Sequence, residues 1–176
     1  AENLYRQGIA AAKEQRMAAA VQYWQQALIH SPERLDVRQQ LILGALSINR
    51  EIADSHFAEA LRLHDALSLR KWYARILLPV AGAVQAVAIL DAQEVAAEED
   101  AEYLSLRAGL WHQTGNYARA EQDYSNLLQV FPDNSLYRFG LAVSFDQQQE
   151  SNKALQSYSQ ALDDGLGNDL RAYALN

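Results

Sequence analysis

Apolar and polar residues alternate along this chain with a period that predicts pairs of amphipathic helices. The small residue at one position of each period is alanine, at Ala20, Ala53, Ala86, Ala120 and Ala154. A bulky apolar residue follows each alanine by four positions, at Trp24, Phe57, Leu90, Tyr124 and Tyr158. Residues four apart share one face of a helix, so each alanine admits a neighbouring helix and the bulky side chain fills the space beside it. The nearly constant interval between successive alanines predicts stacked helix–turn–helix repeats.

One period can be compared in full with a known repeat. Within residues 101–134, the apolar, small and turn positions are occupied by Leu104, Ala108, Trp111, Gly115, Tyr117, Ala120, Tyr124, Leu127, Leu128 and Pro132. This unit resembles the tetratricopeptide repeat, and the resemblance extends over nearly all of the chain. It implies an all-α fold, a right-handed superhelical solenoid of about five helix–turn–helix repeats.

The resemblance also implies a single domain over residues 1–176. We expect repeats at residues 1–34, 35–66, 67–100, 101–134 and 135–168. Residues 169–176 then begin a C-terminal capping helix that is cut short. Because Ala1 already lies inside a repeat and is not a methionine, we expect a trimmed or processed fragment.

Composition excludes several kinds of partner and chemistry. The 15 Lys+Arg and 22 Asp+Glu give a formal net charge of −7, which disfavours nucleic acid as a partner. The absence of cysteine removes disulfides, thiolate catalysis and cysteine-ligated zinc. The longest apolar stretch, residues 76–90, is broken by Pro79 and Gln85 and is shorter than the roughly 20 residues that span a bilayer.

No sequence pattern with catalytic mechanics is present, and we expect neither a cofactor nor a metal. His56 and His64 are eight residues apart, roughly 12 Å along a helix, so they cannot share a metal. With His30 and His112 they are expected to have surface or packing roles. The chain is predicted not to be an enzyme.

Acidic residues gather at Glu94, Glu98, Glu99, Asp100 and Glu102. They lack the alternating ligands and the central glycine of a calcium loop. We interpret them as a solvated turn between repeats, with the last acids placed at the N-terminus of the next helix, where the helix dipole favours negative charge.

The tetratricopeptide resemblance further implies where a protein or peptide would bind. In that family the first helix of each repeat lines the concave surface, mainly through its positions 2, 5, 9, 12 and 13. The residues at such positions here are Tyr5, Ile9, Lys13, Lys71, Arg75, Glu102, Ser105, Gly109, His112, Gln113, Leu136, Phe139, Val143 and Gln147.

Two groups among these residues suggest particular ligands. Lys71 and Arg75 share a helix face and would present a doubled positive charge to a carboxylate or an acidic peptide; alternatively, they pair with nearby acids. Phe139 and Val143 are apolar at open positions beside Gly109, which costs its helix about 1 kcal/mol and leaves space for a ligand. The alternative is that helix packing or the capping helix covers them.

The second helix of the third repeat is almost uniformly apolar over residues 83–90. A helix that is apolar all round is expected to be buried, here by neighbours on both sides. The alternative is an interface with a partner or with a second copy of the chain, so a homodimer is possible.

Two segments carry a closer likeness. Residues 101–120 and the ending at 161–173, with its Leu170-Arg171-Ala172-Tyr173 run, resemble the C-terminal region of the MshN family, which assists biogenesis of the mannose-sensitive haemagglutinin type IV pilus. This resemblance implies a non-enzymatic interaction scaffold for pilus-assembly components. It also implies a periplasmic location, with an inner-membrane anchor outside these residues; a cytoplasmic location is the alternative. Competing interpretations are an accessory domain of a larger enzyme and a self-associating structural module.

Overall fold

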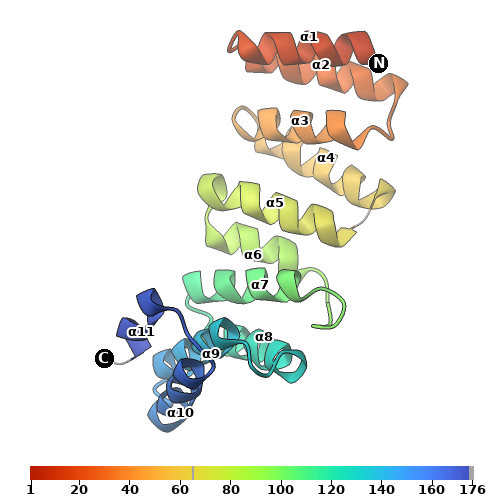
Figure 1. Cartoon of the computed structure of the whole chain (residues 1–176). Coiled ribbons are helices and arrows are strands. Elements are labelled where there is room, and N and C mark those ends of the chain that lie inside the picture. Colours follow the sequence, from red (N-terminus) through yellow and green to blue (C-terminus); the bar gives the residue numbers. More distant parts are fainter. Residues whose placement is uncertain (65, 175–176) are drawn as a thin grey trace. The chain divides into compact units, whose positions relative to one another are not determined.

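The predicted all-α repeat fold is confirmed. The computed structural model describes residues 1–64 and 66–174, and within them it contains eleven helices and no strand. The chain divides into two compact units, residues 1–76 and 77–176, and the boundary lies inside one helix. Each unit is built from antiparallel helix pairs (Figure 1).

The N-terminal unit begins with α1 (Glu2–Lys13) and α2 (Met17–His30), followed by α3 (Leu35–Leu46) and α4 (Arg50–Leu63). The helix α5 (Ala66–Ala81) starts in this unit and contains Pro79 near its end. Glycine permits the closest helix contact: a Cβ added to Gly8 of α1 would lie 2.3 Å from Nε1 of Trp24 in α2. The pairing of α1 with α2 therefore requires a residue without a side chain at that position.

The C-terminal unit continues with α6 (Ala83–Asp91), α7 (Ala101–Gln113) and α8 (Tyr117–Val130). It ends with α9 (Ser135–Gln147), α10 (Ser151–Asp163) and the short α11 (Asn168–Ala174). The helix α11 occupies the position expected for the capping helix, and the rest of that predicted segment, residues 175–176, lies outside the described residues.

The alanine pattern has the packing role that its spacing predicts. Four of the five alanines have no exposed surface, and Ala154 is 3% exposed. The bulky residues that follow them are also largely buried, for example Trp24 at 2% and Leu90 at 0% exposure. Burying an aromatic or leucine side chain stabilises the fold by about 1.5–3 kcal/mol, so this repeated pair forms the core of each unit.

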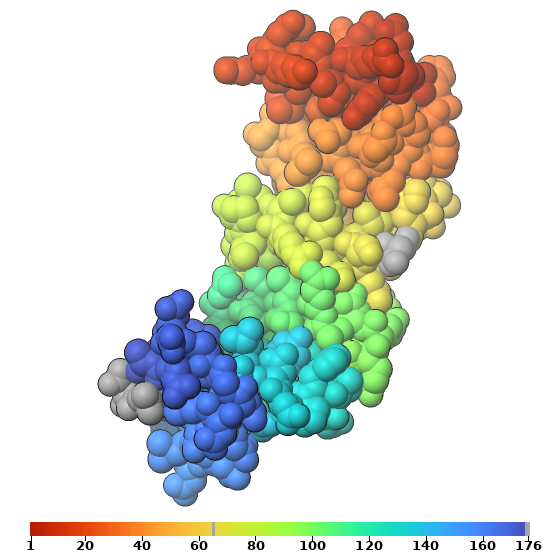
Figure 2. Space-filling model, in the orientation of Figure 1, coloured from red at the N-terminus to blue at the C-terminus, as the bar shows by residue number. Residues whose placement is uncertain are grey.

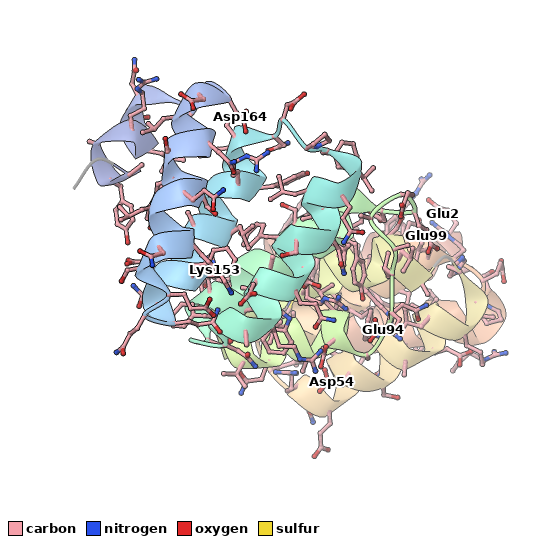
Figure 3. All side chains as sticks on the ribbon, turned by 90° about the horizontal axis from the view of Figure 1, so that it is seen from below. Glu2, Asp54, Glu94, Glu99, Lys153 and Asp164 are labelled. Carbon is pink, nitrogen blue, oxygen red and sulfur yellow. The ribbon has the colours of Figure 1, made fainter. Side chains whose placement is uncertain are left out.

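The acidic segment between α6 and α7 is an ordered turn. Val95 and Ala97 anchor it in the interior, with 8% and 5% of their surface exposed, and they leave Glu94 and Glu99 in solvent (Figure 3). Asp100 caps α7, because its carboxylate accepts a hydrogen bond from the backbone N–H of Tyr103 at 2.9 Å. The interpretation of the last acids as lying at the N-terminus of the next helix is confirmed for Asp100, which in addition caps that helix.

A buried ion pair stabilises the start of the C-terminal unit. Arg107 of α7 donates two hydrogen bonds to Asp123 of α8, at 2.9 and 2.7 Å, and a third to the backbone oxygen of Gln93 at 3.2 Å. Only 6% and 4% of these two side chains is exposed. Arg107 therefore joins α7, α8 and the acidic turn at one point.

The apolar segment at residues 83–90 is buried on one face only, which corrects the expectation of burial all round. Ala86, Val87 and Leu90 are buried in α6, whereas Val84 is 65% exposed and Ala88 is exposed. The physical reason is that the contacts of α6, for example with α7, involve one stripe of the helix, and apolar composition alone does not bury the opposite face.

Neither a candidate membrane span nor a candidate metal site occurs among the described residues. No helix there combines the length and the apolar character needed to cross a bilayer. No group of three or more His, Asp or Glu side chains there could hold a metal ion.

Candidate functional site

The candidate site with the most defined geometry is the exposed face of two neighbouring first helices in the C-terminal unit, which we call the α7–α9 face. It comprises the predicted binding residues Glu102, Ser105, Gly109, His112, Gln113, Leu136, Phe139, Val143 and Gln147. A hydrogen bond between His112 Nε2 and Ser144 Oγ, at 2.7 Å, holds α7 and α9 side by side. The Ser144 hydroxyl also lies 3.0 Å from the backbone oxygen of Gly140, to which it can donate.

Gly109 forms an opening on this face. It lies one turn before His112 in α7 and is partly exposed. Apart from its chain neighbours and the backbone of its own helix, no described atom lies within 4 Å of the position that a Cβ would occupy. Gly140 of α9 is different, because its Cβ would lie 2.4 Å from the ring of Tyr124. Packing therefore explains Gly140, whereas no packing contact among the described residues requires a glycine at position 109.

His112 contributes to packing beside this opening. Its ring lies 5.3 Å from the ring of Tyr124 and 5.9 Å from that of Tyr117. Burial lowers the pKa of His112 below 6.5, because the charged imidazolium would lose solvation there. Burial likewise raises the pKa of Tyr124 to about 12. The imidazole is therefore neutral at pH 7, and the predicted packing role agrees with these contacts.

Phe139 and Val143 are only partly open. Both pack against the cluster of Ala142, Ala154 and Tyr158. The Phe139 ring lies 5.8 Å from that of Tyr158 in α10 and 5.6 Å from that of Tyr173 in α11. The α11 helix thus covers Phe139 in part, as the alternative interpretation of these residues expected. Leu136, one turn before Phe139, remains 58% exposed.

In the N-terminal unit, the first helices carry a second set of predicted binding residues. Tyr5 and Ile9 of α1 are partly exposed, and the guanidinium of Arg34 lies 4.9 Å from the centre of the Tyr5 ring. Leu43 of α3 was missed by the sequence analysis, although it occupies the position of Ile9 in the next repeat and is 42% exposed. The repeat register was the signal that could have identified it.

Lys71 and Arg75 lie one turn apart in α5. Lys71 is partly exposed and Arg75 is exposed. Their predicted role in binding a carboxylate or an acidic peptide stays a prediction.

A pocket near the C-terminal end was also missed by the sequence analysis. It has a volume of 440 Å³ and is lined by residues of α9, α10 and α11, among them Asp146, Leu155 and Tyr173. Its lining includes residues of α10, which is the second helix of its repeat, whereas the tetratricopeptide resemblance placed binding residues on first helices.

Comparisons with known proteins identify the fold. No protein-family model matches the sequence, and no curated protein matches it significantly. The crystal structure of YrrB, a TPR protein with an unusual peptide-binding site, is 15% identical, with a TM-score of 0.63 over 97% of this chain and 89% of that one. MamA is 12% identical, with a TM-score of 0.59 over 98% and 93% of the two chains.

A MamA fragment from Desulfovibrio magneticus RS-1 is 15% identical, with a TM-score of 0.57 over 92% of this chain and 93% of that one. At such low identities a structural likeness shows the fold and nothing finer. Together with the helix pairs and the buried alanines, these neighbours show that the chain has the tetratricopeptide-repeat fold.

Proposed function

We propose that this chain is a non-enzymatic scaffold that binds a protein or peptide on the α7–α9 face. The observation that carries the proposal is the opening at Gly109. A mid-helix glycine costs about 1 kcal/mol relative to alanine, and here no internal contact requires it. Space for a partner's backbone or side chain explains why a methyl group is absent.

The surroundings of Gly109 suit a peptide. Exposed polar groups at Gln113 and Gln147 are available to hydrogen-bond a backbone, and the exposed Leu136 offers apolar contact. Binding sites commonly combine a few polar groups with apolar surface in this way. The peptide-binding site of the structurally similar YrrB supports the same class of function for this chain.

We propose further that the partner belongs to an envelope assembly such as the MSHA-type pilus machinery, and that the chain acts at the periplasmic face of the inner membrane. The sequence likeness of residues 101–120 and 161–173 to the MshN family supports this finer proposal.

Two other functions remain as competing hypotheses. As an accessory domain of an enzyme, the chain would bind a substrate protein through the same face, and flanking sequence would carry catalytic motifs. As a self-associating module, it would use the exposed apolar stripe of α6, which includes Val84 and Ala88. Light scattering over a range of concentrations tests the second hypothesis, which a constant monomeric mass would rule out.

The direct test measures binding of purified pilus-assembly proteins to the immobilised chain. A Gly109→Leu variant fills the opening, and we expect it to weaken binding at least about tenfold, equivalent to about 1.4 kcal/mol. Gln122→Leu, an exposed position on α8, is the matched control and should bind like the unaltered chain. Circular dichroism of both variants must show unchanged helicity.

The possible results distinguish the proposed binding face from the proposed role in pilus assembly. Equal binding by both variants would place the partner elsewhere and defeat the proposed role of Gly109. Binding of an unrelated peptide, but of no pilus-assembly protein, would leave the scaffold function standing and defeat the pilus role.

A further inference from the structure

The pocket between the end of α9, α10 and α11 has the size of a ligand-binding site. Its volume of 440 Å³ falls within the range of roughly 300–1,000 Å³ that is usual for such sites. Ser151, Leu155 and Tyr158 of α10 line one side, and Tyr173 of α11 lines another. All of these residues belong to the C-terminal unit.

The first repeat shows what fills the equivalent position. Ser151, Leu155 and Tyr158 occupy the same repeat positions in α10 as Met17, Val21 and Trp24 occupy in α2. In the N-terminal unit these α2 residues enclose Gly44 of α3. A Cβ on Gly44 would lie 2.9 Å from Met17 Sδ, 3.0 Å from the Trp24 ring and 3.2 Å from Val21 Cγ2. One turn of α3, the first helix of the following repeat, therefore occupies this position, and Gly44 lies at the point of closest approach.

In two repeats of the C-terminal unit the equivalent residue also lies against the following repeat. Val87 of α6 is equivalent to Val21, and it is 3% exposed where α7 packs against α6. Glu121 of α8 accepts a hydrogen bond at 2.7 Å from Gln148, which follows α9. Leu155 is the exception, with 68% of its surface exposed.

The described α11 helix leaves this position open. It has seven residues and packs against α10, and its surface is the darkest blue in Figure 2. Tyr173 of α11 is itself 52% exposed at the edge of the pocket. An exposed leucine and an exposed tyrosine thus face a space that a helix fills elsewhere in this chain.

The charge of the lining indicates the chemistry of the occupant. Asp146 carries the one side-chain charge at neutral pH among the lining residues that the structure describes. The nearby Lys153 is directed away, because its ammonium pairs with Glu150 and lies 5.1 Å from the centre of the Phe145 ring. Figure 3 shows Lys153 on α10, with Asp164 at the far end of the same helix. A basic residue of the occupant would therefore meet Asp146 without competition from Lys153.

We propose that this pocket binds an amphipathic helix of a partner protein. The helix presents a glycine, alanine or serine toward Ser151, Leu155 and Tyr158, apolar residues on either side of it, and a basic residue toward Asp146. This docking surface has its own lining residues, although Phe139 of the α7–α9 face contacts its Tyr158 and Tyr173. It goes beyond the function proposed for the α7–α9 face.

The probe for this proposal is a peptide copied from the chain's own α3. Residues 35–48 are synthesised with a hydrocarbon staple between positions 36 and 40, a fluorophore at the N-terminus, and a Ser47→Lys change that supplies the basic residue. First helices of successive repeats run parallel, so position 47 lies at the same end as Asp146. Fluorescence anisotropy with the whole chain should show saturable binding.

Three variants of the chain and two of the peptide give the expected result. Leu155→Arg, which blocks the pocket, weakens binding at least about tenfold. Ile29→Arg, at an apolar position of α2 that is 78% exposed, leaves the affinity unchanged, as does Gly109→Leu on the α7–α9 face. In the peptide, Gly44→Leu abolishes binding, and glutamate in place of lysine at position 47 weakens it about two- to fivefold, the range of an exposed ion pair.

Several results would overturn the proposal. One is the absence of saturable binding up to about 1 mM peptide, and another is equal binding by the Leu155→Arg and Ile29→Arg variants. A third is protection of the Leu155 methyl groups from a soluble paramagnetic agent in the free protein, since the chain's own residues would then fill the pocket. Because Gly109→Leu is included, failure of this surface is distinguishable from failure of the α7–α9 face.

Discussion

The same substitution, glycine to alanine, should change stability in opposite directions at two positions of the C-terminal unit. Gly109 and Gly140 both lie inside helices, α7 and α9. Alanine at either position gains about 1 kcal/mol, because it loses less backbone freedom on folding than glycine does. The backbone gain is therefore common to the two variants, and only the surroundings of the new methyl group differ.

The structure supplies that difference. At position 109 the methyl group meets no described atom within 4 Å apart from its chain neighbours and its own helix backbone, so Gly109→Ala should stabilise the protein by about 0.5–1 kcal/mol. At position 140 it would lie 2.4, 2.6 and 2.7 Å from three atoms of the Tyr124 ring. The His112 ring, 5.3 Å away, limits the space into which Tyr124 can move. Overpacking of this kind costs about 1–3 kcal/mol, so Gly140→Ala should be destabilised on balance.

Urea unfolding followed by circular dichroism and by tryptophan fluorescence measures both values. The free energies of unfolding of the two variants should differ by about 1–3 kcal/mol, the cost of the clash alone. Thermal midpoints should shift in opposite directions, by about 2–4 °C for each kcal/mol in a chain of this size. If both variants were stabilised equally, the close contact between α8 and α9 would be wrong. If both were destabilised, the opening at Gly109 would be wrong.

Three further predictions concern other contacts. Arg107→Met leaves the Asp123 carboxylate buried without its partner and should lower the free energy of unfolding in urea by about 3–5 kcal/mol. The Arg107→Met/Asp123→Leu double variant should recover most of that stability. An equal loss of stability in both variants would contradict a dominant role for the ion pair. In the folded chain, burial lowers the pKa of His112 and of His56 below 6.5, the value in the unfolded chain. The contribution of these two neutral imidazoles to the free energy of unfolding is therefore present above pH 6.5 and is lost as the pH falls through the folded-state pKa values. His112→Gln should reduce the decrease in stability just below pH 6.5 in denaturation curves, and an unchanged pH profile would refute this. Phe139→Ala removes the ring between Tyr158 and Tyr173 and should speed amide hydrogen exchange in α11 at least about tenfold while leaving α7 unchanged; uniform acceleration would instead indicate global destabilisation.

Local sequence determined which segments became helices and which faces they bury. The alanine and the bulky residue four positions later fix one face of every second helix, because a helix brings residues i and i+4 together regardless of the rest of the fold. The regular recurrence of this pair along the chain then requires each face to find its partner in the next repeat. The cap by Asp100 was predictable for the same reason, since capping depends on residues three positions apart.

For the candidate binding residues, the sequence predicted the helices on which they lie but not the contacts that they make. The tetratricopeptide resemblance placed Gly109, His112, Phe139 and Val143 on first helices, and the structure places them there. It did not reveal that His112 bonds to Ser144, or that α11 covers part of Phe139. These contacts join residues of different helices that are far apart in sequence, and their geometry depends on how neighbouring helices approach one another.

The sequence by itself thus determined the all-α repeat fold, the repeat period and the residues that form the core, because these follow from spacing along a single helix. Only the tertiary structure decided which of two similar glycines serves packing and which leaves an opening. It also decided that α6 is buried on one face, and that Leu155 is exposed where Val21 and Val87 are covered. Burial at these sites depends on whether another helix is present, and that information is not contained in the local pattern of apolar and polar residues.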